Sequence, residues 1–226
     1  YLEVNWGGGA DILRFGQFHQ LLLVFIPASA SHIALPLGYA AGQLGYRAPG
    51  ITYLHDFRLS SESKVSFGLQ INRNSWRDEL PVCVAGQTAP SSNCLPSGVS
   101  VGEASMLPQV EARLMFSSGL ARNPLPFYLP PTWLAYVTGH WDMKDLSGVG
   151  AGAPAQPLRD HLQTMVVQAG FKTQHGPVLV ALNGWYGQNA GSMLGHVFQM
   201  QSLSAANVDV TGFGGWGQIG VGFFRN

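Results

Sequence analysis

The two cysteines, Cys83 and Cys94, have the most clearly defined chemistry in the sequence. They lie in PVCVAGQTAPSSNCLPSG, a loop-like stretch rich in Pro, Gly, Ser and Asn. A disulfide between them would close a short loop in an oxidising compartment and lower the entropy of the unfolded chain. Two unpaired thiols or half of a metal site are the alternatives, but no metal-ligand motif accompanies the pair. We therefore expect a disulfide and no metal site.

We expect no catalytic residues and no cofactor. His55 and Asp56 are adjacent, so in a strand their side chains would point to opposite faces. The seven histidines show no metal-ligand spacing, and His32, His140 and His196 are interpreted as polar residues of loops or of a polar interior. The stretch GGWGQIGVGFF has the glycine content of a phosphate-binding loop, but no helix follows it. Small residues on a tightly coiled strand explain it more simply.

Charged side chains are few and balanced, which restricts the classes of partner. Charged residues make up 11% of the chain and hydrophobic residues 46%, with Lys plus Arg 12 and Asp plus Glu 12. Without a net field the chain is not expected to bind nucleic acid. The 29 glycines, the scattered aromatic residues and the scarcity of a 3.6-residue period favour an all-β fold.

The elements that must position the polar residues follow a period of two. In KVSFGLQIN, Val65, Phe67, Leu69 and Ile71 alternate with polar or small residues, a pattern typical of a strand. The same alternation predicts nine strands, at residues 1–6, 12–18, 51–57, 64–72, 109–117, 132–141, 162–173, 177–188 and 209–224.

The connections between these strands alternate in length. Short ones at 7–11, 58–63 and 175–176 alternate with long ones at 19–50, 73–106, 142–160 and 189–208, while 118–131 is intermediate. Tight turns on one rim and large loops on the other are typical of a transmembrane antiparallel β-barrel. Apolar side chains would then face lipid and polar ones the lumen. Aromatic residues near the strand ends would form the interfacial girdles: Trp133, Trp141, Trp185, Phe223 and Phe224.

A soluble β-sandwich is the alternative fold, because its strands also alternate. The outer face of a soluble sheet is usually rich in Lys, Glu and Arg, whereas the polar positions here are mostly Gly, Ser, Gln, Asn and Thr. Several predicted strands are also longer than is usual in soluble sheets. The pattern therefore favours the barrel over the sandwich.

Residues 20–46, QLLLVFIPASASHIALPLGYAAGQLGY, contain no charged residue. A secretion signal should lie at the chain start behind basic residues, which does not fit this position. A kinked membrane helix over 21–41 remains an alternative, although Pro27 and Pro36 would interrupt it. Because predicted strands flank the segment, we expect a long apolar loop that packs inside the barrel or against a neighbouring subunit.

Four stretches resemble Gram-negative outer-membrane porins, and are most similar to the DcaP-like trimeric diffusion porins: LRFGQ (13–17), GYRAPGITY (45–53), PQVEARL (108–114) and DVTGFGGWGQ (209–218). No one motif is specific, but their order and spacing extend over most of the chain. The resemblance implies a trimeric barrel of about 16–18 strands, of which about nine are represented here. It also implies that the loop at 19–50 folds into the lumen as a constriction. Residues 73–106 would form the disulfide-stapled external loop.

The resemblance also suggests which residues line the pore. Arg14, Arg47 and Arg113 match polar positions near the constriction, and Gln17 belongs to the first matching stretch. By alternation, Lys64, Glu111 and Lys172 share the polar face with Arg14 and Arg113, as does Glu3. Arg14 and Arg113 would favour anions such as carboxylates, unless Glu111 and Arg113 pair with each other.

The chain departs from a complete porin. Complete porins are larger, begin with a cleaved signal and normally end in an aromatic residue, and bacterial barrels have an even number of strands. Residues 1–226 are therefore interpreted as one barrel domain that is an internal fragment of a longer protein.

The favoured function is passive diffusion of small hydrophilic or partly apolar solutes through the bacterial outer membrane, without enzymatic activity. The expected partners are two further copies in a homotrimer, outer-membrane lipid, lipopolysaccharide and the solutes themselves. Two alternatives stay open. One is an outer-membrane barrel whose loops are adhesive or enzymatic, and the other is a secreted soluble β-sandwich that binds carbohydrate through exposed aromatic residues.

Overall fold

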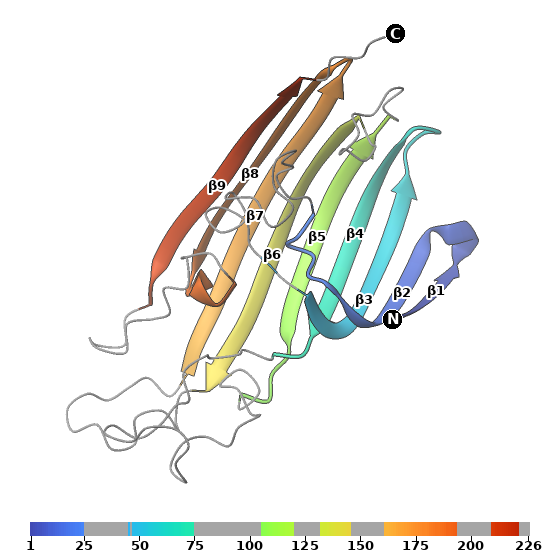
Figure 1. The fold of residues 1–226 in the computed structure, drawn as a ribbon. Coiled ribbons are helices and arrows are strands. Elements are labelled where there is room, and N and C mark those ends of the chain that lie inside the picture. Colours follow the sequence, from blue (N-terminus) through green and yellow to red (C-terminus); the bar gives the residue numbers. More distant parts are fainter. Residues whose placement is uncertain are drawn as a thin grey trace, which may run out of the picture.

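The computed structural model describes residues 1–24, 45, 47–74, 105–119, 132–145, 161–193 and 209–221. Within these residues the chain is all-β, and nine antiparallel strands form a single sheet in chain order (Figure 1). The strands are β1 (Leu2–Trp6), β2 (Asp11–His19), β3 (Arg47–Arg58), β4 (Ser63–Asn72), β5 (Gln109–Ser118), β6 (Trp133–Asp145), β7 (His161–His175), β8 (Val178–Gln188) and β9 (Thr211–Val221). Two 3-10 turns accompany them, η1 (Gly7–Gly9) and η2 (Ala190–Met193).

Each strand pairs with the next one along the chain, so every connection joins neighbours in the sheet. The short described connections are the β1–β2, β3–β4 and β7–β8 turns. In the first turn Gly7, Gly8 and Gly9 have φ values of 61°, 68° and 85°, which side chains other than glycine adopt only at a cost. β1 and β9 are the two edges, and the described sheet is not closed.

The two faces of the sheet differ sharply in chemistry. Residues that pair across antiparallel strands share a face, so the register sorts every side chain. We call one side the apolar face, because Val65, Phe67, Leu69 and Ile71 of β4 lie on it together with their partners on β3 and β5. We call the other side the polar face, because Ser66, Gln70 and Asn72 lie on it.

Burial on these faces is the reverse of that in a soluble sheet. Gln70, Gln109, Glu111 and Gln168 on the polar face are fully buried, with 0% exposure. Large side chains on the apolar face are exposed, up to 83% for Phe213. The members of this exposed set include Leu2, Val4, Trp6, Phe15, Ile51, Phe57, Leu69, Leu114, Val137, Val167, Leu182, Tyr186 and Ile219. Many side chains of the polar face are therefore covered, while the large apolar side chains of the other face are exposed.

The chain after β2 covers part of the polar face. Gln20 to Val24 leave the end of β2 and cross in front of the middle strands (Figure 1). We call these five residues the inward chain. Leu22 reaches β7 and β8, where it belongs to a buried cluster with Val166, Trp185, Ala190 and Met193. The backbone N–H of Gly45 donates to the carbonyl of Met193, at 3.3 Å. The two described ends of the long β2–β3 connection therefore lie on the same face.

The sequence prediction of an all-β chain with nine strands is confirmed, with shifts at some ends. β3 begins at Arg47, four residues before the predicted Ile51, and β6 continues to Asp145 instead of ending at Trp141. In the part of the chain that the structure describes, no helix has the length and apolar character needed to cross a membrane. Most of the predicted loop at 19–50 and of the one at 73–106 lies outside the described residues.

Trp185 was predicted on the same face as the other girdle aromatics, and this is wrong. It pairs with Gln168 and Gly214 on the polar face and is 4% exposed. Tyr186, the next residue, occupies the apolar face instead. The reason is that the inward chain supplies Leu22 as an apolar partner, so one tryptophan of the polar face packs there.

Candidate functional site

Two separate hydrogen-bonded ion pairs lie on the polar face. We call the end of the sheet with the β1–β2, β3–β4 and β7–β8 turns the short-turn rim, and the opposite end the long-connection rim. On β2, Arg14 Nε donates to Glu3 Oε2 of β1 at 2.7 Å. Two strands further, Lys64 Nζ and Ser66 Oγ both donate to Asp56, each at 2.5 Å. Carboxylates and cations of this face are therefore matched across neighbouring strands.

The centre of the polar face holds a buried network that connects β5, β6 and β7. His140 uses one ring nitrogen toward Glu111 and the other toward Asp142, both at 2.9 Å. Lys144 donates to Asp142 Oδ1 at 2.9 Å and to Thr164 at 2.6 Å. The side chains of Glu111, His140 and Asp142 have no exposed area. Buried charges need such complete pairing, because an unpaired one would carry a large desolvation cost.

The same network holds the inward chain. Glu111 Oε2 accepts the backbone N–H of Leu21 at 2.6 Å, so this carboxylate binds both His140 and the segment. Gln168 Nε2 donates to the carbonyl of Leu22 at 2.6 Å, and Gln20 donates to Gln109 at 3.0 Å. Three hydrogen bonds from β5 and β7 thus position Gln20 to Leu22 across the polar face.

Tyr136 supports this arrangement from β6. Its ring lies over Gly170 of β7, where an added Cβ would come within 2.3 Å of the ring. Its hydroxyl donates to Asn183 Oδ1 at 2.6 Å on β8 and accepts from Gln168 at 2.9 Å. A glycine at 170 is therefore needed for one side chain to connect three strands.

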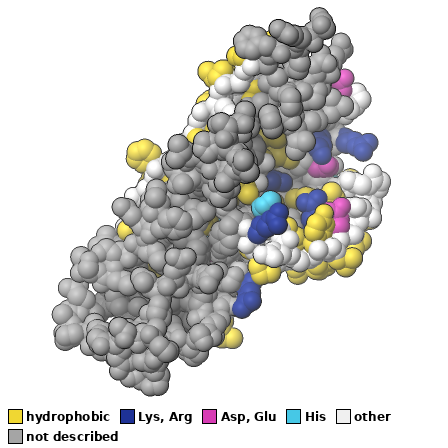
Figure 2. Space-filling model, viewed as in Figure 1, with side chains coloured by type: hydrophobic (Ala, Val, Ile, Leu, Met, Phe, Trp, Pro, Cys, Tyr) yellow, Lys and Arg dark blue, Asp and Glu magenta, His cyan; other side chains and the backbone are white. Residues whose placement is uncertain are grey.

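A cavity of about 700 Å³ lies on the polar face beside the short-turn rim. Its cationic lining residues are Arg58, Lys64 and Arg113, and Val24 of the inward chain borders it. Among the described lining residues, Glu62 is the one with an acidic side chain. The Nε atom of Arg113 is buried and has no hydrogen-bond partner within the described chain. Figure 2, in the view of Figure 1, shows Lys and Arg side chains interspersed with Asp and Glu where this side of the described chain is visible.

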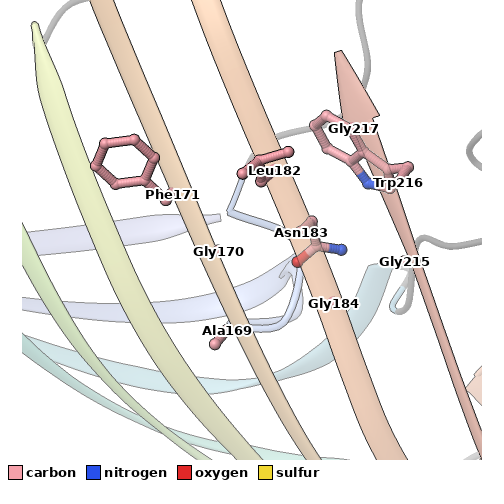
Figure 3. Close-up of a pocket in the computed structure, with 9 residues that line it drawn as sticks. All are labelled: Ala169, Gly170, Phe171, Leu182, Asn183, Gly184, Gly215, Trp216 and Gly217. Atoms are coloured by element: carbon pink, nitrogen blue, oxygen red, sulfur yellow. The ribbon is translucent and has the colours of Figure 1, made fainter.

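A second hollow lies on the opposite, apolar side of β7, β8 and β9 and has a volume of about 640 Å³ (Figure 3). Phe171 and Leu182 stand beside a floor of small residues that includes Gly184, Gly215 and Gly217. The described residues that line it include no charged side chain.

The structure brings together four of the six residues predicted to line a pore. Arg14, Lys64, Glu111 and Arg113 all lie on the polar face, as the alternation predicted. The open question of a Glu111–Arg113 pair is answered as well. Glu111 binds His140 and Leu21, and no ion pair joins it to Arg113 in the described chain.

Gln17 and Arg47 do not join this group. Gln17 pairs with Pro49, and Arg47 pairs with His19, in the same alternating set as Phe15 and Ile51. They therefore lie on the apolar face, at the long-connection rim, and both are exposed. Gln17 lies three positions from Arg14 in the same strand, and an odd separation places two side chains on opposite faces. Arg47 lies on the apolar face because β3 begins at Arg47, so this residue belongs to the strand and alternates with it.

His140, Asp142 and Lys144 were missed as a connected group. The predicted strand ended at Trp141, so the continuation DMKD (142–145) was assigned to a loop, separate from His140. Residues 140–145 still alternate, with His140, Asp142 and Lys144 on one face and Trp141 and Met143 on the other. The signal was therefore present in the sequence.

Other predicted features lie outside the described residues, among them Cys83, Cys94, His32 and His196. The expectation that the chain contains no G-x-S-x-G spacing is wrong, because residues 98–102 read GVSVG, and these residues also lie outside the described ones. Among the described residues, no group of three or more His, Cys, Asp or Glu side chains could hold a metal ion.

Comparison with protein-family models, with curated proteins and with solved structures found no match to this chain.

Proposed function

We propose that this chain forms part of the wall of a bacterial outer-membrane porin, a β-barrel through which small solutes diffuse. The reversed burial is the observation that supports the proposal most strongly. Exposed Leu, Phe, Val and Ile side chains cover one face, while Gln, Glu, Asp, His and Lys are buried on the other. A barrel in lipid requires this arrangement, since its outside contacts hydrocarbon and its inside contacts water and inward loops.

Aromatic residues at both ends of the apolar face fit the height of a bilayer. On β6, Trp133 lies near the short turns and Trp141 near the long connections, on the same face. Eight residue steps separate them, or about 27 Å along the strand, which a tilt reduces toward the roughly 25 Å apolar band of outer-membrane barrels. Tyr186 of β8 pairs directly with Phe213 of β9 near the long connections. Trp6 and Phe57 lie near the short turns.

A soluble sandwich is less well supported. It would need a second sheet packed on the apolar face. The described strands form one sheet, and its apolar face is exposed. A closed barrel needs more strands than the described ones, because β1 and β9 are unpaired on their outer sides. The resemblance to DcaP-like porins supplies the proposed homotrimer.

The polar face favours anions in this proposal. Arg14 and Lys64 are neutralised by Glu3 and Asp56, and Lys144 by Asp142. At the cavity beside Val24, the described residues place Arg58 and Arg113 with one carboxylate, that of Glu62. Since permeation depends on the sign of charges at the narrowest part, small carboxylates are the proposed preferred solutes.

Planar-bilayer recording of the complete gene product tests the function. Stable ion steps from detergent-purified trimers are expected, with a reversal potential under a salt gradient that indicates anion preference. A protein that stays in solution after carbonate washing without detergent would exclude the barrel. Membrane-embedded protein without conductance steps would instead favour a barrel with adhesive or enzymatic loops.

A further inference from the structure

The cavity beside the short-turn rim is bounded by a row of polar residues from three neighbouring strands. Arg58 of β3 pairs with Lys64 of β4, and Lys64 pairs with Ser117 of β5. All three residues line the cavity. Direct partners in antiparallel strands have Cβ atoms about 4.5–5.5 Å apart, so side chains of this row can contact one ligand.

The β3–β4 turn adds hydroxyl groups to this row. Ser60 and Ser61 both line the cavity. Ser60 Oγ accepts the backbone N–H groups of Glu62 and Ser63, at 3.2 and 3.0 Å, and these bonds leave its hydroxyl hydrogen for another acceptor. Together with Ser117, three serine hydroxyls therefore line this end of the cavity and can donate to a ligand.

The cationic groups of the lining are only partly neutralised. Lys64 Nζ donates to Asp56, so its charge is matched. Arg58 and Arg113 form no ion pair within the described chain, and the Nε atom of Arg113 is buried without a hydrogen-bond partner there. Among the described lining residues, Glu62 supplies one carboxylate. The remaining charge of this lining therefore favours an anionic ligand.

Apolar side chains line the same cavity. Leu134 pairs with Ser117 across β5 and β6, and Met115 lies on β5 between Arg113 and Ser117, on the same face. Both line the cavity, as does Val24 of the inward chain. A volume of about 700 Å³ is within the range of pockets that hold small organic ligands. We therefore expect the ligand to carry an organic group beside its charge.

A phosphomonoester fits these donors better than a carboxylate does. Its phosphate has three terminal oxygens in a tetrahedral arrangement and a charge of about −1.5 to −2 at pH 7. A carboxylate is planar, with two oxygens and one charge. Arg58, the serines of the turn and Ser117 come from two strands and a connection, so they approach a ligand from different sides. A guanidinium group also forms paired, charge-assisted hydrogen bonds with phosphate oxygens.

We propose that this cavity binds the phosphomonoester of a small organic molecule, with the phosphate at Arg58 and the three serine hydroxyls. The organic group lies against Met115 and Leu134. This inference rests on the proposed porin, in which the cavity lies inside the barrel. Conduction requires that a solute bind weakly enough to leave. A phosphomonoester, held by more donors than a carboxylate, therefore occupies the cavity for longer and slows the passage of carboxylates.

Single-channel recording of the complete gene product tests this with phenyl phosphate as the probe. Phenyl phosphate should interrupt the ion steps transiently, and benzoate and inorganic phosphate should each show an affinity about ten-fold weaker. Arg58→Gln should weaken the block by phenyl phosphate about ten-fold, and Ser117→Ala about five-fold. Arg47→Gln is the matched control, because it makes the same change at the other end of β3 on the apolar face. It should be blocked as the unmodified protein is.

The outcomes separate the inference from the channel proposal. Ion steps that benzoate blocks as well as phenyl phosphate does, or equal block of Arg58→Gln and the unmodified protein, would overturn the inference and leave the channel proposal intact. Equal block by inorganic phosphate would overturn the part assigned to the organic group. Absence of ion steps in the unmodified protein would overturn the channel proposal instead. Binding is then read from the melting temperature in detergent, which phenyl phosphate should raise in the unmodified protein and not in Arg58→Gln.

Discussion

Neighbouring charged residues on the polar face have different contacts. Glu111 binds both a neighbouring strand, through His140, and the inward chain, through Leu21. Arg113, two residues along the same strand, has a buried Nε without a hydrogen-bond partner in the described chain and borders the cavity. Glu111 thus takes part in structural hydrogen bonds, whereas the Nε atom of Arg113 has no partner in the described chain.

Replacing Arg113 with Gln should reduce anion preference. The substitution removes a cation from the cavity while keeping a long polar side chain. The reversal potential under a salt gradient should shift toward that of a cation-preferring channel, and Arg113→Lys should keep the original sign. Arg47→Gln is a charge-matched control on the apolar face, and it should leave selectivity unchanged. An unchanged potential in Arg113→Gln would contradict the role given to this cavity.

Replacing Glu111 with Gln should loosen the inward chain. The buried His140 would lose one of its two carboxylate partners, and breaking such a pair costs about 3–5 kcal/mol. A lower melting temperature together with larger or noisier ion steps is expected. Glu62→Gln makes the same chemical change on an exposed turn and should leave the melting temperature unchanged. Wild-type melting and conductance in Glu111→Gln would show that the network does not hold the segment.

The strands and their faces were largely predictable, whereas the contacts of the inward chain were not. Alternation places Lys64 and Arg113 on one face without any tertiary information, because the period of a strand is local. Arg47 was misplaced because the strand begins before Pro49, a residue that usually lowers a strand prediction. The bond from Gln168 to Leu22 joins residues 146 positions apart, and no local pattern encodes such a pair.

The Gln20–Val24 segment should depend on Leu22 more than on Leu23. Leu22 is fully buried against β7 and β8, whereas Leu23 is partly exposed. Leu22→Ser should therefore create a cavity and cost about 2–5 kcal/mol by analogy with large-to-small core changes. Conductance should rise in Leu22→Ser, because the segment would leave the wall, and should change less in Leu23→Ser. Equal effects of the two substitutions in bilayer recordings would argue against the observed packing.

At the scale of the whole described sheet, one face exposes apolar side chains, and the proposed barrel predicts which surface substitutions are harmful. Leu182→Arg lies on the apolar face and should destabilise the protein in lipid vesicles by about 2–4 kcal/mol, measured by denaturant titration. Gln218→Arg, on the polar face of the neighbouring strand, is the matched control and should cost less. In a soluble sheet the order would be reversed, because Leu182 is 50% exposed while Gln218 is half-buried.

The hydrogen bonds that fix Gln20 to Leu22 come from β5 and β7, strands that follow it in the chain. During synthesis and insertion the segment therefore has no wall to bind until those strands have paired. Contacts between residues so far apart form late, since the chain must first close a long loop. The narrowest part of the proposed passage would consequently be completed after most of the wall, and a folding intermediate would be wider than the finished channel.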